Sequence, residues 1–348
     1  MTSKKRPMQL SEIGEFGLID RLTKDIILKH KTSLKGVGDD AAVIECGDTC
    51  RVVTTDMLTE GIHFDLIYTP LKHLGYKAVV VNLSDVYAMN AIPQQITVSI
   101  AVSSKFSVEA IEELYSGIHL ACQQYDVDLV GGDTVSSLSG LIISVTAIGE
   151  ARKEDIRYRS GAESNDLICV TGDLGGAFLG LQLLEREKAL YEKDKATQPD
   201  LTGFDYVLER QLKPEARWDI IEWFKEKNIR VHAMIDISDG LSSELNHICK
   251  ASGKGCHIFP DKLPIHPDVK EAAKQFNMEY LIPVLHGGED YELLFTVPLS
   301  EYDKVSQRED VHIIGKITKD GERPLLITDD GKFAELVAQG WEGFSRGE

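Results

Sequence analysis

The sequence predicts an α/β protein of two domains with mixed sheets, and three observations support this. The chain has 348 residues, more than a single hydrophobic core usually supports. Strand-like and helix-like segments alternate along it, but hairpin-like strands are interspersed, which disfavours a Rossmann domain. A charged stretch with a Ser-Gly break at residues 151–165 separates two such series. We therefore predict one domain over residues 1–150 and a second over residues 151–348.

In the first half, helices are predicted where apolar residues recur at helical spacing, and strands where β-branched residues cluster or alternate. The expected helices cover residues 11–29, 71–90 and 107–125, and the expected strands cover residues 51–55, 95–103, 129–130 and 141–148. Ser11 fits the N-cap of the first helix. Gly131-Gly132-Asp133 is expected as a turn after the strand at 129–130.

The second half repeats this alternation. The expected strands cover residues 167–171, 233–237, 291–297, 311–317 and 324–328, and the expected helices cover residues 177–187, 215–227 and 241–251. Residues 188–203 are charged and turn-rich, so we expect a solvated excursion there. The glycine turn at residues 172–176 matches neither the dinucleotide nor the P-loop pattern. It is interpreted equally well as a tight strand-to-helix connection or as an anion site at a helix start.

Composition and charge disfavour several classes of protein. The 38 basic and 56 acidic residues give a net charge of −18, which disfavours nucleic-acid binding because phosphate contacts need clustered Lys and Arg. No apolar run approaches the roughly 20 residues that span a bilayer, and no secretory signal is expected. The six cysteines include no C-x-x-C pair, which disfavours zinc and favours reduced thiols in a cytoplasmic protein.

Acidic residues recur beside glycines, hydroxyls and strand ends. Five segments share this design: Gly38-Asp39-Asp40, Thr54-Thr55-Asp56, Ser84-Asp85, Gly131-Gly132-Asp133 and Asp236-Ile237-Ser238-Asp239-Gly240. A carboxylate at a strand end is held rigidly, and an adjacent glycine lets a bound phosphate approach the backbone. Carboxylate, hydroxyl and water oxygens suit Mg²⁺. One Asp-Gly pair is usually only a turn or a cap, but five segments favour a shared metal site.

Asp85 is the least expected of these acids, because the helix around it is apolar. Its neighbours on that face include Ala78, Val81 and Val86. A buried carboxylate is costly unless it is paired or bound to a metal ion. Asn82, three residues earlier, shares the same face.

Other polar or aromatic residues each allow two interpretations. His63 is more often structural than functional when it stands alone. Arg159 is either a linker charge or a phosphate clamp. The acids of residues 287–292 form either a turn with a solvated strand edge or part of a site. Trp341 and Phe344 either anchor the C-terminal tail or stack on a heteroaromatic ligand.

Taken together, these segments resemble the thiamine-monophosphate kinase family. The motifs run in the family's order over nearly the whole chain: Gly14-Glu15-Phe16, Gly38-Asp39-Asp40-Ala41-Ala42, Thr54-Thr55-Asp56, Gly61-Ile62-His63-Phe64, Asn82-Leu83-Ser84-Asp85, Gly131-Gly132-Asp133-Thr134, Arg159-Ser160-Gly161-Ala162, Asp236-Ile237-Ser238-Asp239-Gly240-Leu241 and Gly287-Gly288-Glu289-Asp290-Tyr291-Glu292-Leu293. The resemblance implies the two-domain fold of aminoimidazole ribonucleotide synthetase and selenophosphate synthetase. It also implies a homodimer formed through the sheet of the N-terminal domain. The implied reaction is Mg²⁺-dependent transfer of the γ-phosphate of ATP to thiamine monophosphate, giving thiamine diphosphate.

The resemblance also implies roles for individual residues. The implied Mg²⁺ ligands are Asp40, Thr54, Thr55, Asp56, Asp85, Asp133, Asp236 and Asp239, with Asp39 as a neighbouring acid. The implied ATP contacts are Tyr115, Gly132, Asp133, Arg159 and Ser238. The implied contacts to thiamine monophosphate are His63, Glu289 and Phe344. The nucleophile would be a substrate phosphate oxygen that is already ionised, so no catalytic base is named.

One departure from the family and two alternatives remain open at this point. The family often ends with a further aromatic residue, and here Gly347 follows Arg346 instead. Another ATP-using enzyme of the same superfamily is one alternative. Selenophosphate synthetase would need a reactive Cys near the N-terminus, and a hydrogenase-maturation dehydratase would need a C-terminal one, whereas the first and last cysteines are Cys46 and Cys256. A non-catalytic sensor of metal or nucleotide is the alternative from another class.

Overall fold

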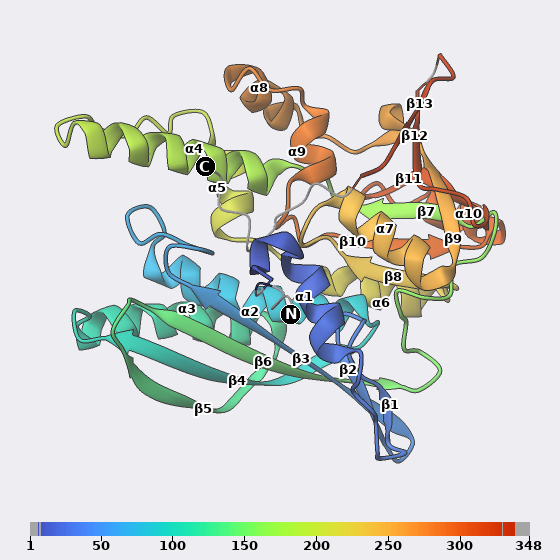
Figure 1. Ribbon diagram of the computed structural model, residues 1–348, viewed down its shortest axis with the longest axis horizontal. Helices are drawn as coiled ribbons and strands as arrows, with labels where there is room; N and C mark the ends of the chain where they lie inside the picture. The colour runs from blue at the N-terminus through green and yellow to red at the C-terminus, as the bar shows by residue number, and fades with distance from the viewer. Residues whose placement is uncertain (1–5, 7, 329, 338–348) are drawn as a thin grey trace, which may run out of the picture.

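The computed structural model describes residue 6 and residues 8–337 except 329, and it confirms the predicted fold class (Figure 1). Two sheets form the framework. The first has the strand order β1-β2-β3-β6-β4-β5, and the second has the order β13-β12-β9-β11-β7-β10-β8. The first sheet ends at Arg152 and the second begins at Leu167. Within the described part of the chain, no helix combines the length and the apolar character that a membrane crossing requires.

The first sheet is covered on one face by two long helices (Figure 1). Its strands are β1 Ser33–Lys35, β2 Ala42–Cys46, β3 Thr49–Thr59, β4 Ile92–Ser103, β5 Asp128–Ser137 and β6 Ile142–Arg152, and the helices are α2 Leu71–Ala88 and α3 Val108–Tyr125. Ile143, Val145 and Ala147 of β6 point into the core. Alternate residues occupy the opposite face, where Met57 and Ser99 are exposed. This alternation is expected for a sheet covered on one side only.

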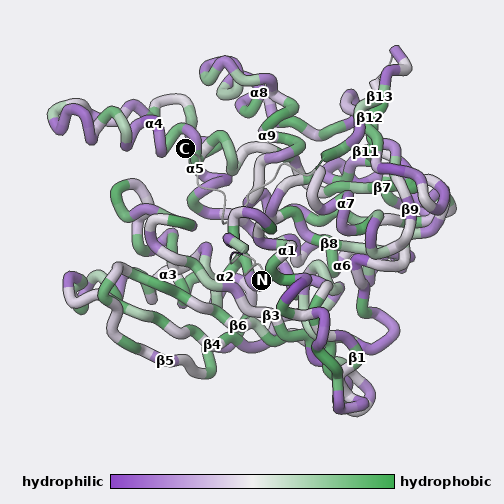
Figure 2. Tube along the Cα trace, viewed as in Figure 1, coloured by the Kyte–Doolittle hydropathy of each residue, from purple (hydrophilic) through white to green (hydrophobic). Residues whose placement is uncertain are grey.

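The second sheet is mostly antiparallel, with β9 and β12 as its parallel pair. Its strands are β7 Leu167–Thr171, β8 Ala233–Asp236, β9 Lys254–Ile258, β10 Leu293–Val297, β11 Val311–Asp320, β12 Leu325–Ile327 and β13 Phe333–Glu335. The other helices are α1 Gly14–Thr23, α4 Gly176–Lys193, α5 Asp205–Leu212, α6 Trp218–Lys227, α7 Leu241–Ser252, α8 Pro267–Gln275, α9 Leu281–His286 and α10 Tyr302–Val305. Figure 2 shows that apolar residues gather along β3, β4 and β6 and that hydrophilic residues increase toward the outer end of α4.

Most predicted elements occur at the expected places, and the differences have local causes. Ser107 caps α3 by accepting a hydrogen bond from the Ala110 N–H. Ser11 instead lies in a short 3₁₀ turn, and Ile13 precedes α1. The expected excursion begins too early, because α4 continues to Lys193 and buries Leu183, Leu184 and Glu187. Gly131-Gly132-Asp133 is not a turn, since these residues pair with β4 inside β5.

Helix α2 joins the two halves of the chain. Its Tyr76 hydroxyl donates to Glu215 at 2.7 Å, and its Ser84 hydroxyl donates to Asp236 of β8 at 2.6 Å. The Lys77 ammonium forms an ion pair with Glu289 at 3.0 Å. One buried helix therefore carries polar contacts to three separate segments of the second half.

Candidate active site

Three carboxylates from distant segments converge beside α2. Asp40 comes from the turn before β2, Asp85 from the last turns of α2 and Asp236 from the end of β8. One oxygen from each lies within 4.8 Å of the others. Asp40 and Asp236 are buried, and Asp85 is half-buried. All three are residues that the sequence predicted as metal ligands. This all-oxygen donor set suits a hard divalent cation.

Each of these carboxylates has one protein partner that fixes its orientation. Thr54 donates to Asp85 at 2.6 Å, and Ser84 donates to Asp236 at 2.6 Å. Arg159 donates to Asp40 from Nη2 at 2.6 Å and from Nε at 3.2 Å. Oδ2 of Asp40 is buried without a hydrogen-bond partner among the described residues. A buried carboxylate oxygen left in this state is costly, so it favours a bound cation.

The neighbouring predicted acids lie around this cluster. Asp39 accepts a hydrogen bond from the Arg159 backbone N–H at 2.9 Å and forms an ion pair with Lys35 at 3.0 Å. It therefore fixes the backbone of Arg159. The Asp56 backbone N–H donates to Asn82 of α2 at 3.0 Å. Asp239 is held by Glu244, which accepts a hydrogen bond from its backbone N–H at 2.8 Å.

Thr55 faces away from the carboxylate cluster. Side chains alternate along β3, so Thr54 contacts α2 while Thr55 lies on the opposite face. Its hydroxyl donates to the Val145 carbonyl at 3.0 Å and accepts from Thr146. Within one chain, the structure therefore does not bring the Thr55 hydroxyl to Asp85.

Burial and mutual repulsion raise the pKa values of the clustered acids. Burial raises the pKa of Asp40 to about 6, where the Arg159 charge limits the rise. Burial, with repulsion from Asp40, raises the pKa of Asp236 to about 8. Burial raises the pKa of Asp85 well above its usual value, and the charges of Asp56 and Asp236 add to this effect. The cluster therefore binds protons when it has no cation.

These shifts predict how stability varies with pH in EDTA. A carboxyl with a folded pKa above its unfolded value stabilises the fold while it is protonated, and this contribution is lost as the pH rises through the folded pKa. The free energy of unfolding should therefore fall as the pH rises from about 5 to 8, and Asp236 contributes to the upper part of this range. Thermal unfolding across this range measures the slope, and Asp236→Asn should flatten it. A stability that rises toward pH 8 in EDTA would contradict the shifts.

The predicted substrate residues His63 and Glu289 adjoin one small cavity. His63, Tyr68, Lys77 and Gln211 are among its lining residues. Glu289 pairs with Lys77 and accepts a hydrogen bond from Gln211 at 2.9 Å. Burial lowers the pKa of His63, whose Nδ1 accepts from the Thr59 N–H, so a neutral imidazole is favoured.

Lys77 and Gln211 were not predicted from the sequence. The sequence contained an indication for Lys77, because a single cation in the apolar part of α2 is as unusual as the single acid Asp85 there. Gln211 lies in α5, which was not predicted, and it had no comparable signal. Phe344, predicted to contact the substrate, lies outside the described residues.

Gly132 and Asp133 of the edge strand β5 form a separate group with Tyr115 of α3. Together they line an open hollow between α3 and this strand. Strands β4 and β6 lie between β5 and β3. The pairing Ser99↔Asp133 places Asp133 on the exposed face of the sheet, which is also the face of Thr55. One chain alone therefore does not bring Asp133 to the Asp85 cluster.

The glycine turn at residues 172–176 is a tight connection from β7 to α4. The backbone N–H groups at the start of α4 already donate hydrogen bonds to a carboxylate of this chain. Asp290 accepts hydrogen bonds from the Gly175 N–H at 2.8 Å and the Ala177 N–H at 3.5 Å. Asp290 and Glu292 are both buried, so the interpretation as a solvated strand edge is wrong for these two acids. Ser238 belongs to the same packed region, since its carbonyl accepts from the Glu289 N–H at 2.7 Å.

Comparisons with known proteins define first the class and then the family. Residues 38–151 match the N-terminal domain of AIR synthase related proteins, and residues 163–325 match their C-terminal domain. Hydrogenase maturation protein HypE in complex with ATP shares the fold at 19% identity, covering 92% of this chain and 94% of its own, with a TM-score of 0.66. The class is therefore that of the AIR-synthase-related α/β proteins.

Relatives with higher sequence identity to this chain than HypE are named as one enzyme, thiamine-monophosphate kinase. The thiamine-monophosphate kinases of Aquifex aeolicus and Bacillus subtilis are 34% and 35% identical, over 97% and 95% of this chain and the whole of their own lengths. A solved structure described as AaThiL complexed with AMPPCP and TMP is 33% identical, with a TM-score of 0.82, and covers 98% of this chain and all of its own. The chain belongs to the thiamine-monophosphate kinase family, as its motifs predicted. Its enzymatic class is that of a phosphotransferase.

Proposed function

We propose that this chain transfers the γ-phosphoryl group of ATP to thiamine monophosphate, giving ADP and thiamine diphosphate. The observation that carries the proposal is the convergence of Asp40, Asp85 and Asp236 beside Arg159. Family membership supports it, because a structure 33% identical to this chain is described with AMPPCP and TMP bound. His63 lines a small cavity, and Glu289 is bonded to two of its other lining residues, Lys77 and Gln211, so we assign the contacts to thiamine monophosphate to this region.

The donor set fits Mg²⁺, with Asp40, Asp85 and Asp236 as the central ligands and with Thr54, Asp56 and Asp239 around them. Bound Mg²⁺ would neutralise the charge of the transferred phosphoryl group. Both guanidinium nitrogens that bond Asp40 lie on one edge of Arg159, which leaves the other edge, with Nη1, to bond a phosphate. Asp39 fixes the backbone of Arg159 by accepting a hydrogen bond from its N–H.

The protein's contribution to the reaction is alignment. The attacking substrate phosphate is ionised at neutral pH, so no side chain has to remove a proton from it. His63, held by the Thr59 N–H, and Glu289, held by Lys77 and Gln211, would orient the thiamine moiety. Ser238 adjoins the Glu289 loop and would contact ATP from the same side. Correct placement of the two phosphates for in-line attack is the largest contribution available without a base.

We further propose a homodimer formed through the exposed face of the first sheet. Asp133 and Thr55 share that face, and neither side chain reaches the Asp85 cluster of its own chain. A two-fold contact across the face would bring Asp133 of the partner subunit to Thr55 and its neighbours. Tyr115 of α3 and Gly132 of β5, which line one hollow together with Asp133, would then contact the nucleotide.

The direct test is to incubate the purified chain with ATP, Mg²⁺ and thiamine monophosphate and to separate the thiamine compounds by chromatography. We expect thiamine diphosphate to form, to require thiamine monophosphate rather than free thiamine, and to disappear with EDTA. Binding of ATP in the presence of Mg²⁺ without any product would instead favour the non-catalytic sensor.

A further inference from the structure

The loop that carries Glu289 has an unusual backbone. Glu289 has φ = 66° and Tyr291 has φ = 51°, and non-glycine residues rarely adopt such values. A backbone of this kind persists only where its surroundings hold it in place. On one side, the Glu289 and Tyr291 N–H groups donate to the carbonyls of Ser238 and Ile237. The opposite side is held by α4 and α5.

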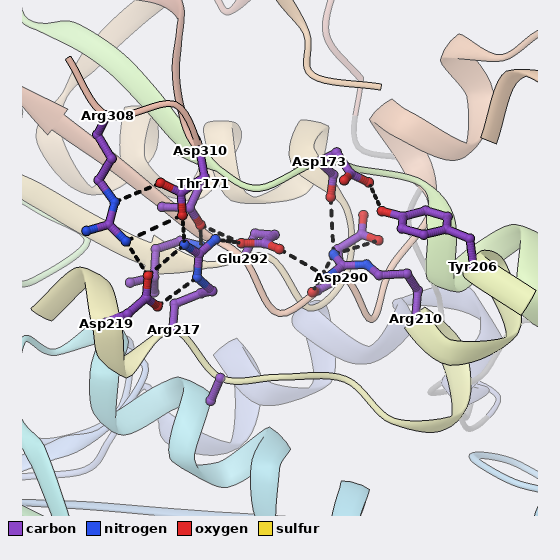
Figure 3. Close-up of polar contacts among 12 residues, drawn as sticks. Thr171, Asp173, Tyr206, Arg210, Arg217, Asp219, Asp290, Glu292, Arg308 and Asp310 are labelled. Atoms are coloured by element: carbon purple, nitrogen blue, oxygen red, sulfur yellow. Dashed lines mark hydrogen bonds and ion pairs between the residues drawn. The ribbon is translucent and has the colours of Figure 1, made fainter. Parts of the chain in front are cut away.

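Arg210 of α5 makes the contacts on that opposite side (Figure 3). Its Nη2 donates to the backbone carbonyls of Asp290 and Asp173, each at 3.1 Å. Its Nη1 forms an ion pair with Glu292 at 3.1 Å. One guanidinium therefore bonds both the Glu289 loop and the glycine turn before α4.

Two glycines at the start of α4, Gly176 and Gly180, make this close approach possible. A Cβ at Gly176 would lie 3.0 Å from Cγ of Arg210, and a Cβ at Gly180 would lie 2.1 Å from the Val207 carbonyl oxygen of α5. The glycine-rich sequence thus allows α5 to pack against the start of α4. This packing explains why glycine is present at positions 176 and 180 without requiring a bound phosphate.

The residue after Arg210 reaches the functional carboxylate itself. Gln211 donates to Oε2 of Glu289 at 2.9 Å, while Arg210 bonds the carbonyl of the residue that follows Glu289. Helix α5 therefore fixes the side chain of Glu289 and the backbone of the next residue, Asp290. Loss of Arg210 would release both constraints, because it also bonds α5 to the glycine turn.

We propose that Arg210 is a positioning residue that holds Glu289 for thiamine monophosphate and thereby sets the affinity for that substrate. The inference rests on the proposed function, since it takes Glu289 as a substrate contact. Arg210 does not touch the Asp40–Asp85–Asp236 cluster through any contact in the described chain. Its effect should therefore appear in substrate binding and not in the metal-dependent step.

The test compares two Arg→Met variants in the same polar network. Arg210→Met should raise the KM for thiamine monophosphate at least about tenfold and leave kcat and the KM for ATP within about twofold. Arg308→Met is the matched control, because Arg308 pairs with Asp219 and Asp310 at the far end of the network. The control should leave all three parameters near wild type.

A second variant guards against a folding defect. Arg210→Met leaves Glu292 with one fewer cation, so Arg210→Met/Glu292→Gln removes both charges and keeps an acceptor for Arg217. It should show the same rise in KM for thiamine monophosphate. Hydrogen exchange at the Glu289 and Tyr291 amides should be faster in both Arg210 variants than in Arg308→Met.

Other results would overturn the inference, and they identify which proposal fails. If Glu289→Gln raises the KM for thiamine monophosphate but neither Arg210 variant does, the proposed function stands and the positioning role is wrong. Equal rises in both KM values, or the same rise in Arg308→Met, would reduce Arg210 to general structural support. If the wild-type chain itself shows no turnover that depends on thiamine monophosphate, both proposals fall together.

Discussion

Asp85→Asn is expected to lower turnover by roughly three orders of magnitude and, at pH 8 in EDTA, to raise the melting temperature. Turnover should fall because Asp85 is one of the three clustered oxygen donors, with Asp40 and Asp236. Asparagine keeps an acceptor for the Thr54 hydroxyl, so the local hydrogen bond survives. The negative charge that complements a divalent cation is lost.

The stability effect has the opposite sign because Asp85 is surrounded by like charges. Burial and the charges of Asp56 and Asp236 raise its pKa, so ionising it at pH 8 destabilises the cation-free fold. The neutral amide of the variant would remove that cost, and it would also remove most of the stabilisation that Mg²⁺ confers on the wild type. Thermal unfolding in EDTA and in Mg²⁺, beside the turnover assay, measures both effects.

Asp166→Asn is the matched control for this substitution. Asp166 is also buried, but it pairs with His232 at 2.9 Å and lies outside the acid cluster. Its substitution should lower the melting temperature in EDTA and in Mg²⁺ alike. Near-normal turnover of Asp85→Asn at saturating Mg²⁺, or a melting temperature that responds to Mg²⁺ as strongly as that of the wild type, would remove Asp85 from the metal site.

Elements with a clear local pattern could be predicted from the sequence, and elements defined by distant contacts could not. Helix α3 has helical spacing and a Ser107 cap, and β7 is a short apolar run, so both were found with nearly correct bounds. Helix α5 is short and half of its residues are polar, and its position depends on contacts to loops far away in the chain. The Arg210 contact to Asp290, for example, spans 80 residues.

The same distinction between local pattern and distant contacts applies to the residues of the candidate site. Acids beside glycines and strand ends indicated which residue types would gather, and Asp40, Asp85 and Asp236 do converge. Thr54 and Thr55 were both predicted as metal ligands, although the two-residue period of a strand already implies that their side chains lie on opposite faces. The burial of Asp290 was unpredictable, because its partner Gly175 lies 115 residues earlier.

A mixed dimer of one Asp85→Ala chain and one Asp133→Ala chain should recover about half of the wild-type turnover, although each homodimer is nearly inactive. The reason is the position of Asp133 on the exposed face of β5, separated from β3 by two strands. If Asp133 serves the site of the other chain, one site of the mixed dimer carries both substitutions and the second carries neither. Two affinity tags allow the mixed dimer to be purified before assay.

The matched control is a mixed dimer of Asp85→Ala and Asp236→Ala. These residues converge within one chain, so each of its sites retains one damaged cluster and the dimer should stay inactive. If both mixed dimers are inactive, Asp133 acts within its own chain or not at all, and the proposed contact through the sheet loses its main support. Recovery in the first and not in the second can arise only if a site takes Asp133 from a different chain than Asp85, because no single chain in that mixture has both residues.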